Sequence, residues 1–235
     1  MTAAELAQAW STVERAVAEH AKFPPGALDS SVWSTAAAGK VSHRQDDNGV
    51  IGVGVIPAGR AAVWLAITDD NPVDVVSGLT QVAWNGAWAS DKLLYQRLDL
   101  PWPFQDRQWV AQSRTNLALA GSGAWERAWT NAPAQLPVAR GLTDAAAFDA
   151  ALSIPESKGS WITVALSPTA TLALYQASVR LGGQLPAGAA DQYAAASLPD
   201  FYESILNDAR SMSHRYVSNC VQPDGEGRPL PCFGD

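Results

Sequence analysis

The stretch Leu98-Asp99-Leu100-Pro101-Trp102-Pro103-Phe104-Gln105-Asp106-Arg107-Gln108-Trp109-Val110 decides the fold of this chain. Its prolines fix their own backbone φ angle and favour extended backbone in the residues before them. Strand-like runs flank the prolines, so we expect a stiff corner between two strands that holds a large aromatic ring in place. Asp106 and Arg107 stand at the start of the second strand. We interpret them as a structural ion pair that pins the corner.

The strand after the corner has two different faces, because side chains alternate along a strand. One face combines a large ring with small side chains, which leaves room for a ligand against the sheet. It consists of Trp109, Ala111, Ser113 and Thr115. The other face is more polar, and we expect it to meet solvent. It consists of Gln108, Val110, Gln112 and Arg114.

Helical patterns lie towards the two ends of the chain, and strand patterns lie between them. Apolar spacing predicts helices over 3–21 and 191–217, and Pro24-Pro25-Gly26 ends the first. Strands are expected at 41–56 (broken near Asp46–Gly49), 80–86, 92–99, 108–119, 124–130, 136–141, 160–166 and 170–179. Short helices are expected at 60–69, 72–79 and 143–152, and an irregular segment with a short strand near Val32-Trp33 at 27–40.

Strands grouped together, with helices at the ends, are typical of the α+β class rather than of a parallel α/β sheet. The sequence shows no internal repeat and no linker, so we predict a single domain over 1–217. Its N-terminal helix lies within 1–22 and its C-terminal helix at 191–217. Residues 218–235 form a tail.

The composition excludes several functions. Hydrophobic residues make up 47% of the 235 residues and charged residues 17%, and the net charge is −7. No basic run exists, so we expect no nucleic-acid partner. The longest uncharged run, 159–179, is interrupted by Ser167-Pro168-Thr169 and predicts two strands rather than a membrane span. Ten tryptophans can fill a core or line an apolar site.

Motifs for cofactor, metal or acid–base chemistry are not found. Gly52, Gly54 and Gly59 are reminiscent of a dinucleotide loop, but Pro57 occupies the third glycine position and the strand-loop-helix context is missing. The three histidines have no partners at metal-ligand spacing. We therefore expect no cofactor, no metal and no catalytic residue.

The two cysteines, Cys220 and Cys232, both lie in the tail. A disulfide between them would stabilise the tail by about 3 kcal/mol and would imply an oxidising compartment. Two free thiols in a cytosolic protein are the alternative. Thr2-Ala3-Ala4-Glu5 matches a helix capping box rather than a secretory signal. We therefore expect a cytoplasmic protein, or a periplasmic or secreted one if the cysteines are bonded and a signal peptide was removed.

Several motifs resemble the StAR-related lipid transfer (START) family. Residues 101–110 are similar to its Pro-Trp-Pro, Asp-Arg-Asp, aromatic, Val signature. Residues 181–186 resemble its Gly-Gly-x-Leu-Pro turn into the final helix, and 159–161 with 171–179 resemble its late strand pair. Gln108 replaces a second Asp, and the segment after Asp69-Asp70 lacks the usual Trp-Asp. The chain is therefore similar to a divergent, bacterial-type member of the wider helix-grip (SRPBCC) superfamily.

This resemblance implies a helix-grip fold, in which a curved antiparallel sheet wraps around a long C-terminal helix and encloses a hydrophobic cavity. It implies a carrier for one lipid, such as a sterol, phospholipid or carotenoid, that is not an enzyme. A polyketide cyclase or aromatase using the same cavity is the alternative, and a ligand sensor without transport is a third option. We expect a monomer that makes transient membrane contact.

The expected ligand contacts lie on the strands around the corner and on the last helix. Ser113, Tyr175 and Arg97 are candidates to orient a polar head group, and Met212 offers an adaptable wall. The full set is Tyr95, Arg97, Trp102, Trp109, Ala111, Ser113, Tyr175, Phe201, Ile205, Ala209 and Met212. The loop 101–107 and the C-terminal helix are expected to open relative to each other to admit the ligand.

Overall fold

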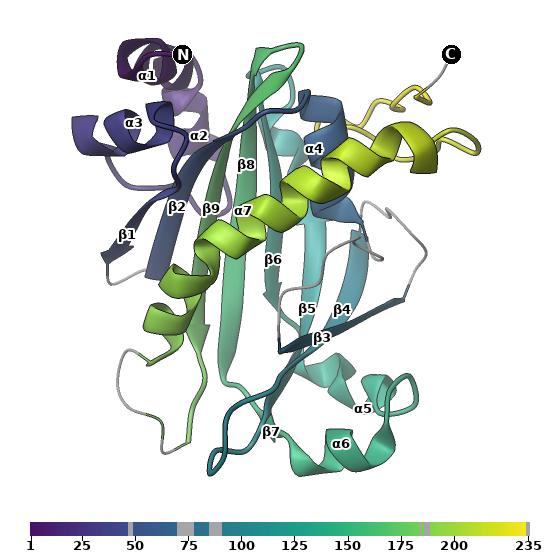
Figure 1. The fold of residues 1–235 in the computed structure, drawn as a ribbon. Coiled ribbons are helices and arrows are strands. Elements are labelled where there is room, and N and C mark those ends of the chain that lie inside the picture. The colour runs from purple at the N-terminus through teal and green to yellow at the C-terminus, as the bar shows by residue number, and fades with distance from the viewer. Residues whose placement is uncertain (47–48, 70–77, 85–90, 184, 186–188, 234–235) are drawn as a thin grey trace.

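The computed structural model describes residues 1–46, 49–69, 78–84, 91–183, 185 and 189–233 (Figure 1). Its strands are β1 (Ser42–Asp46), β2 (Gly49–Ile56), β3 (Leu79–Trp84), β4 (Asp91–Leu98), β5 (Arg107–Thr115), β6 (Ala124–Asn131), β7 (Leu152–Ser153), β8 (Glu156–Ser167) and β9 (Ala170–Arg180). Its helices are α1 (Ala3–Ser11), α2 (Glu14–His20), α3 (Ser30–Ala37), α4 (Arg60–Thr68), α5 (Leu136–Ala139), α6 (Ala145–Ala150) and α7 (Ala189–Arg215), with 3-10 turns η1 (Leu117–Leu119) and η2 (Pro133–Gln135).

One curved sheet of nine strands organises the molecule, and α7 lies diagonally across its concave side (Figure 1). The strand order is β1-β2-β9-β8-β6-β5-β4-β3, and these neighbours are antiparallel. The short β7 pairs with β5 in parallel. The predicted α+β class and the helix-grip architecture are therefore confirmed. We call the side of the sheet that faces α7 the inner face.

Two glycines of β2 allow α7 to pack closely on the inner face. A Cβ atom on Gly52 would lie 2.9 Å from a methyl carbon of Leu198, and one on Gly54 would lie 2.9 Å from the ring of Tyr202. Side chains at these positions would push the helix away from the sheet. Gly52 and Gly54 therefore allow α7 to pack closely on β2. This role agrees with the conclusion from the sequence that they are not part of a dinucleotide-binding loop.

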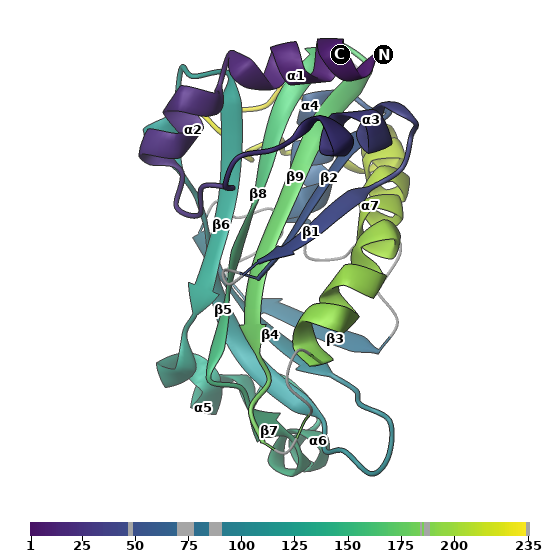
Figure 2. The same cartoon turned by 90° about the vertical axis from the view of Figure 1, so that its left-hand side faces the viewer.

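The N-terminal helices cover the outer face of β2, β8 and β9 (Figure 2). Leu6, Trp10 and Trp33 belong to one buried cluster with Ile162 and Val164 of β8. The predicted capping box starts α1 at Thr2. The expected single helix over 3–21 is wrong in one respect, because it divides into α1 and α2 around residues 12–13.

The part of the outer face around Gln108 and Val110 is covered by α5 and α6, which corrects the expectation that this part meets solvent, whereas Arg114 at the other end of β5 is exposed as expected. Tyr95, Val110, Ala139 and Phe148 form a buried cluster there. Gln108 is 3% exposed, and its amide donates to the carbonyl oxygens of Phe148 and Ala151. The polar side chain thus binds the backbone of α6 instead of water.

The corner residues Asp106 and Arg107 are structural, but they do not form the expected pair with each other. The Asp106 carboxylate accepts from the Leu100 backbone N–H at 3.1 Å and lies 3.8 Å from the Arg97 guanidinium. The buried Arg107 guanidinium donates to the carbonyl oxygens of Leu181, at 2.9 Å, and Gly182, at 3.2 Å. Leu181 and Gly182 follow β9 and precede α7 in the chain. Arg107 therefore links the corner to the segment between β9 and α7.

Two other expectations from the sequence are wrong. Residues 30–37 form α3, because the Asp29 carboxylate accepts from the backbone N–H groups of Ser31 and Val32 and caps a helix. The segment 136–141 is helical rather than a strand, since Pro137 suits the first turn of a helix. The remaining predicted strands and the helices at 60–69, 143–152 and 191–217 are confirmed within a few residues. The short helix expected at 72–79 lies largely outside the described residues.

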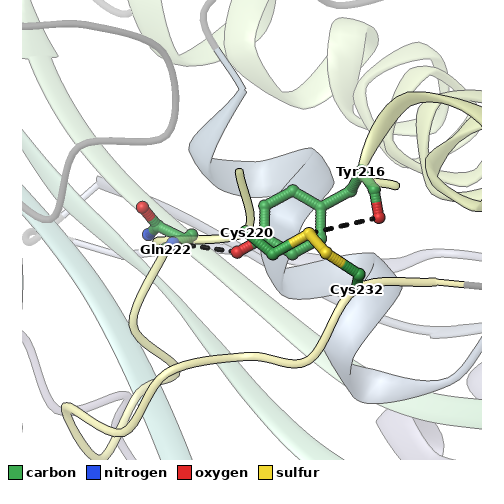
Figure 3. Close-up of a disulfide and its surroundings, with 4 residues drawn as sticks. All are labelled: Tyr216, Cys220, Gln222 and Cys232. Atoms are coloured by element: carbon green, nitrogen blue, oxygen red, sulfur yellow. Dashed lines mark hydrogen bonds between the residues drawn. A yellow bond between two sulfur atoms is a disulfide. The ribbon is translucent and has the colours of Figure 1, made fainter. Parts of the chain in front are cut away.

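The C-terminal tail is loop, as predicted, but it is fastened to the domain. A disulfide joins Cys220 to Cys232 beside the ring of Tyr216 (Figure 3). The Tyr216 hydroxyl accepts from the Gln222 backbone N–H at 2.8 Å, and the Tyr216 carbonyl accepts from the Phe233 N–H at 2.8 Å. Of the two alternatives for these cysteines, the bonded one is therefore present, and Gln222 inside the disulfide loop and Phe233 beyond it both bond to Tyr216 just after α7.

The middle of the tail covers two tryptophans near one end of the sheet. The Trp64 indole N–H donates to the Pro223 carbonyl at 3.1 Å. Gly225 lies so close to Trp125 that a Cβ atom would come within 2.1 Å of its ring. Arg60 also stacks on Trp125, with its guanidinium 3.7 Å from the Trp125 ring centroid. Within the described part of the chain, none of the helices combines the length and apolar character needed to cross a membrane.

Candidate functional site

Strand register identifies which side chains face α7. Residues paired directly across strands share a face. Tyr175 pairs with Gly52 and with Trp161, and Trp161 pairs with Arg127. Arg127 pairs with Thr115, so residues at two-residue steps from Thr115 along β5 also face inward. The predicted ligand face of Trp109, Ala111, Ser113 and Thr115 is thus the inner face.

A chain of aromatic rings occupies the inner face beneath α7. Trp161 lies with its ring centroid 4.9 Å from that of Tyr175 and 5.2 Å from that of Tyr202. Tyr175 also lies 5.7 Å from Trp129 and stacks on Phe201 at 5.7 Å. The rings come from three adjacent strands and from α7. They form a continuous apolar and aromatic surface, which is the kind of lining that ligand sites use.

Tyr175 is the most informative residue of this surface. It lies so deep that burial raises the pKa of its phenol well above the usual value. The residue nevertheless keeps part of its surface accessible. Its hydroxyl has no hydrogen-bond partner among the described residues, so it is available to a polar group of a ligand.

Tyr202, the neighbouring tyrosine of α7, has a structural role instead. Its hydroxyl lies 2.9 Å from the Gly52 carbonyl oxygen and 2.8 Å from that of Ala173. These contacts hold α7 against β2 and β9. Burial raises the pKa of its phenol. The two tyrosines therefore differ: one is anchored to the backbone, and the other presents its hydroxyl within the site.

The inner face of β5 combines apolar and polar groups. Ala111 and Trp109 pack with Leu98, Ile154 and Leu181. Ser113 is 5% exposed, and its hydroxyl accepts from the Arg127 guanidinium at 2.8 Å.

A second buried cation lies on the neighbouring strand β4. Lys92 bonds to the Thr68 carbonyl oxygen at the end of α4. The polar part of the inner face thus gathers around β4, β5 and β6, while its aromatic part lies towards β8 and β9.

The four expected ligand contacts on α7, which are Phe201, Ile205, Ala209 and Met212, divide into two pairs. Phe201 and Ile205 are half-buried, and Phe201 touches Tyr175. Ala209 and Met212 are fully buried in a cluster that includes Trp64 and Leu65 of α4. Phe201 and Ile205 therefore border the site, whereas Ala209 and Met212 pack α7 against α4.

Three predicted residues do not face α7, and we leave them out of the candidate site. Tyr95 points to the outer face, where its hydroxyl donates to Gln108 and its ring lies 5.8 Å from Phe148. Arg97 also lies on the outer face and bonds to Asp99 at 3.1 Å. Trp102 is 93% exposed at the corner. A two-residue period alone does not say which face of a strand is inner, and this caused the error for Tyr95 and Arg97.

Sequence reasoning also missed several residues of the inner face. Trp129 and Arg127 alternate with outward residues along β6, and that alternation was the available signal. Trp161 and Gln96 lie on strands whose register was not known. In the described part of the chain, no cluster of three or more His, Cys, Asp or Glu side chains is arranged to hold a metal ion.

This architecture is the helix-grip fold of StAR-related lipid transfer domains. The structure is similar to that of a StAR-related lipid transfer protein from Xanthomonas axonopodis, with 22% identity and a TM-score of 0.50 over 73% of this chain and 91% of that chain. It is also similar to human STARD10, with 11% identity and a TM-score of 0.52 over 84% of each chain. At these identities the likeness confirms the resemblance at the level of the fold.

A weaker likeness is to the Zhui aromatase/cyclase from a Streptomyces species, with 13% identity and a TM-score of 0.46 over 73% of this chain and 94% of that chain. No protein-family model matches the sequence, and no curated protein matches it in sequence.

Proposed function

We propose that this protein binds a hydrophobic lipid, such as a sterol, phospholipid or carotenoid, between α7 and the inner face, and carries it. The observation that supports this most is Tyr175, which is deep, partly accessible and surrounded by rings of Trp129, Trp161 and Phe201. A hydrocarbon skeleton placed against these rings would leave water, at a gain of about 25 cal/mol per Å² of apolar surface. Ordering of the ligand and of side chains offsets part of that gain.

Native mass spectrometry and lipid extraction test binding directly. The protein is incubated with vesicles that contain a panel of lipids, separated from them, and weighed intact. We expect a bound lipid mass that disappears on denaturation. A protein that carries no lipid and takes none up from the panel contradicts the proposal. Transfer between donor and acceptor vesicles then separates a carrier, which moves lipid, from a sensor, which binds without transfer.

The Pro-Trp-Pro corner supports transient contact with a membrane. Trp102 is 93% exposed and Phe104 is 40% exposed at the same turn. Tryptophan favours the interface between lipid head groups and hydrocarbon. We expect Trp102→Ala to reduce binding to vesicles of phosphatidylcholine, which has no net charge, measured by sedimentation. Val221, which is 81% exposed in the tail, provides the control substitution Val221→Ala. Equal vesicle binding by both variants would argue against this contact.

A cyclase or aromatase is the second candidate. The unbonded hydroxyl of Tyr175 supports it, since such a group in an aromatic site can donate a hydrogen bond to a reacting carbonyl and stabilise the charge that develops on its oxygen. A polyketide analogue incubated with the protein distinguishes the two functions. A carrier returns the analogue with its mass and absorbance unchanged, whereas a cyclase returns a dehydrated aromatic product.

The disulfide supports an oxidising compartment, such as the periplasm or the exterior of a cell, because cytosolic thiols are kept reduced. Alkylation of the protein in extracts of its native source, followed by mass spectrometry, tests this: Cys220 and Cys232 should resist alkylation until a reductant is added. We propose that the carrier acts as a monomer, which light scattering during gel filtration would check.

A further inference from the structure

Three polar side chains cross the inner face in a row at its far edge. Gln81 on β3 pairs directly with Gln96 on β4, and Gln96 pairs directly with Trp109 on β5. The Trp109 indole N–H donates to Gln96 Oε1 at 2.8 Å, and Gln96 Nε2 donates to Gln81 Oε1 at 2.9 Å. We call these three residues the amide row.

The direction of the amide row is fixed by chemistry. An indole nitrogen can only donate a hydrogen bond. Gln96 must therefore turn its oxygen towards Trp109, which turns its NH2 group towards Gln81. Gln81 in turn must offer its own oxygen to Gln96. The row consequently ends in the Gln81 NH2 group, whose nitrogen has no hydrogen-bond partner among the described residues.

The inner-face neighbours of the amide row are mostly apolar, and the exception is the buried Arg107, which pairs directly with Leu98. On one side lie Leu79 and Leu98, and on the other lie Ala83, Leu94 and Ala111, all on the inner face of the same three strands. Gln81 and Gln96 are half-buried. Placing amides in an apolar surface has a free-energy cost unless each polar atom is bonded. One acceptor would satisfy Trp109, so a second glutamine that leaves a donor unbonded points to a further partner.

We propose that the Gln81 NH2 group binds an oxygen acceptor of the ligand, such as a carbonyl, ester or hydroxyl oxygen. This inference rests on the proposed function, because it needs a ligand between α7 and the inner face. It adds a specific requirement to that function: an apolar skeleton alone is bound less tightly than the same skeleton that carries an oxygen acceptor. Trp109 and Gln96 act as positioning residues that orient the terminal amide.

A pair of fluorescent probes tests this requirement. The first is 6-propionyl-2-(dimethylamino)naphthalene, which has a ketone oxygen, and the second is 6-propyl-2-(dimethylamino)naphthalene, which lacks it. Titration of the full chain with each probe gives two dissociation constants. One hydrogen bond of ordinary strength predicts that the ketone binds about fivefold more tightly. Emission of the ketone bound to the wild type should also lie at longer wavelength than that of the ketone bound to Gln81→Leu, because hydrogen bonding to its oxygen stabilises the excited state.

Two variants assign the preference to Gln81. Gln81→Leu should reduce the ratio of the two constants to about one while the propyl probe binds as before. Gln81→Glu keeps the shape, removes the donor and should weaken ketone binding more than propyl binding. Thr80→Val, on the opposite face of β3, is the control and should keep the wild-type ratio.

The outcomes separate the two proposals. A wild-type protein that binds both probes equally, or a ratio that survives both Gln81 variants, overturns the inference and leaves the proposed function standing. A wild-type protein that binds neither probe and no lipid overturns both.

Discussion

Arg107 provides a stringent test of how the corner supports α7. Its guanidinium is 3% exposed and donates to the carbonyl oxygens of Leu181 and Gly182, just before the final helix. It also donates to the Gln105 carbonyl within the corner. Arg107→Lys keeps the positive charge but replaces a planar fork of donors by one compact ammonium group. At least two of these three carbonyl groups should lose their donor.

Bonds from a charged donor are each worth about 1.5–3 kcal/mol when broken in a buried place, so two of them predict a loss of about 3–6 kcal/mol. Partial rescue by the lysine ammonium places our expectation at the lower end. Urea unfolding followed by tryptophan fluorescence measures this loss, and hydrogen exchange should rise at residues 181–183. Arg114→Lys, on the same strand but with a 60% exposed side chain, is the control. A loss below about 0.5 kcal/mol in Arg107→Lys, the usual range for surface substitutions, would refute the reasoning.

Three further predictions concern packing, the tail and pH. Gly52→Ala should cost about 1–3 kcal/mol in urea unfolding, because its Cβ would lie 2.9 Å from a leucine methyl of α7; an unchanged midpoint would contradict this. Reduction of the Cys220–Cys232 disulfide, or its replacement by two serines, should cost about 3 kcal/mol in thermal unfolding, and only the wild type should respond to reductant. Burial raises the phenol pKa of Tyr175 and Tyr202. Above the usual tyrosine pKa of about 10 the unfolded chain therefore releases protons that the folded chain retains. The contribution of these two groups to stability is fully present below that pH and is lost as the pH rises above it. Tyr202→Phe should reduce the fall in unfolding free energy between pH 9 and 11, and an unchanged fall would count against this assignment.

The parts of the fold that the sequence predicted are those governed by local chemistry. Prolines at 101 and 103 located the corner, and the turn signal in the sequence at 46–49 predicted the break between β1 and β2. The errors arose where tertiary contacts decide. The polar pattern of β5 predicted that Gln108 meets solvent, but α6 covers it. Which side chains of β4 face α7 could not be predicted, because this depends on the strand register that places Gln96 opposite Trp109. Those contacts join residues far apart in the sequence. The alternation of side chains along a single strand does not predict which strand it pairs with or in which register.

The site shows the same division. Trp109, Ala111 and Ser113 could be predicted because they alternate along one strand. Trp129 and Trp161 could not be assigned, since a buried tryptophan has the same sequence signature in a core as in a ligand site. Gln81 could not be identified from the sequence, because its proposed role depends on Trp109, an obligate hydrogen-bond donor that lies two strands away.

Ligand uptake by a variant that fills the site tests the central claim most directly. Ile205 is half-buried on the side of α7 towards the inner face, and Glu203 is exposed on the same helix. Ile205→Trp adds a large ring between α7 and the sheet, whereas Glu203→Trp adds the same ring to the surface. Both proteins are incubated with mixed-lipid vesicles and weighed by native mass spectrometry. We predict that the wild type and Glu203→Trp retain a lipid and that Ile205→Trp, still folded by circular dichroism, retains far less. Equal retention by the two variants, or none by the wild type, would contradict a ligand site between α7 and the inner face.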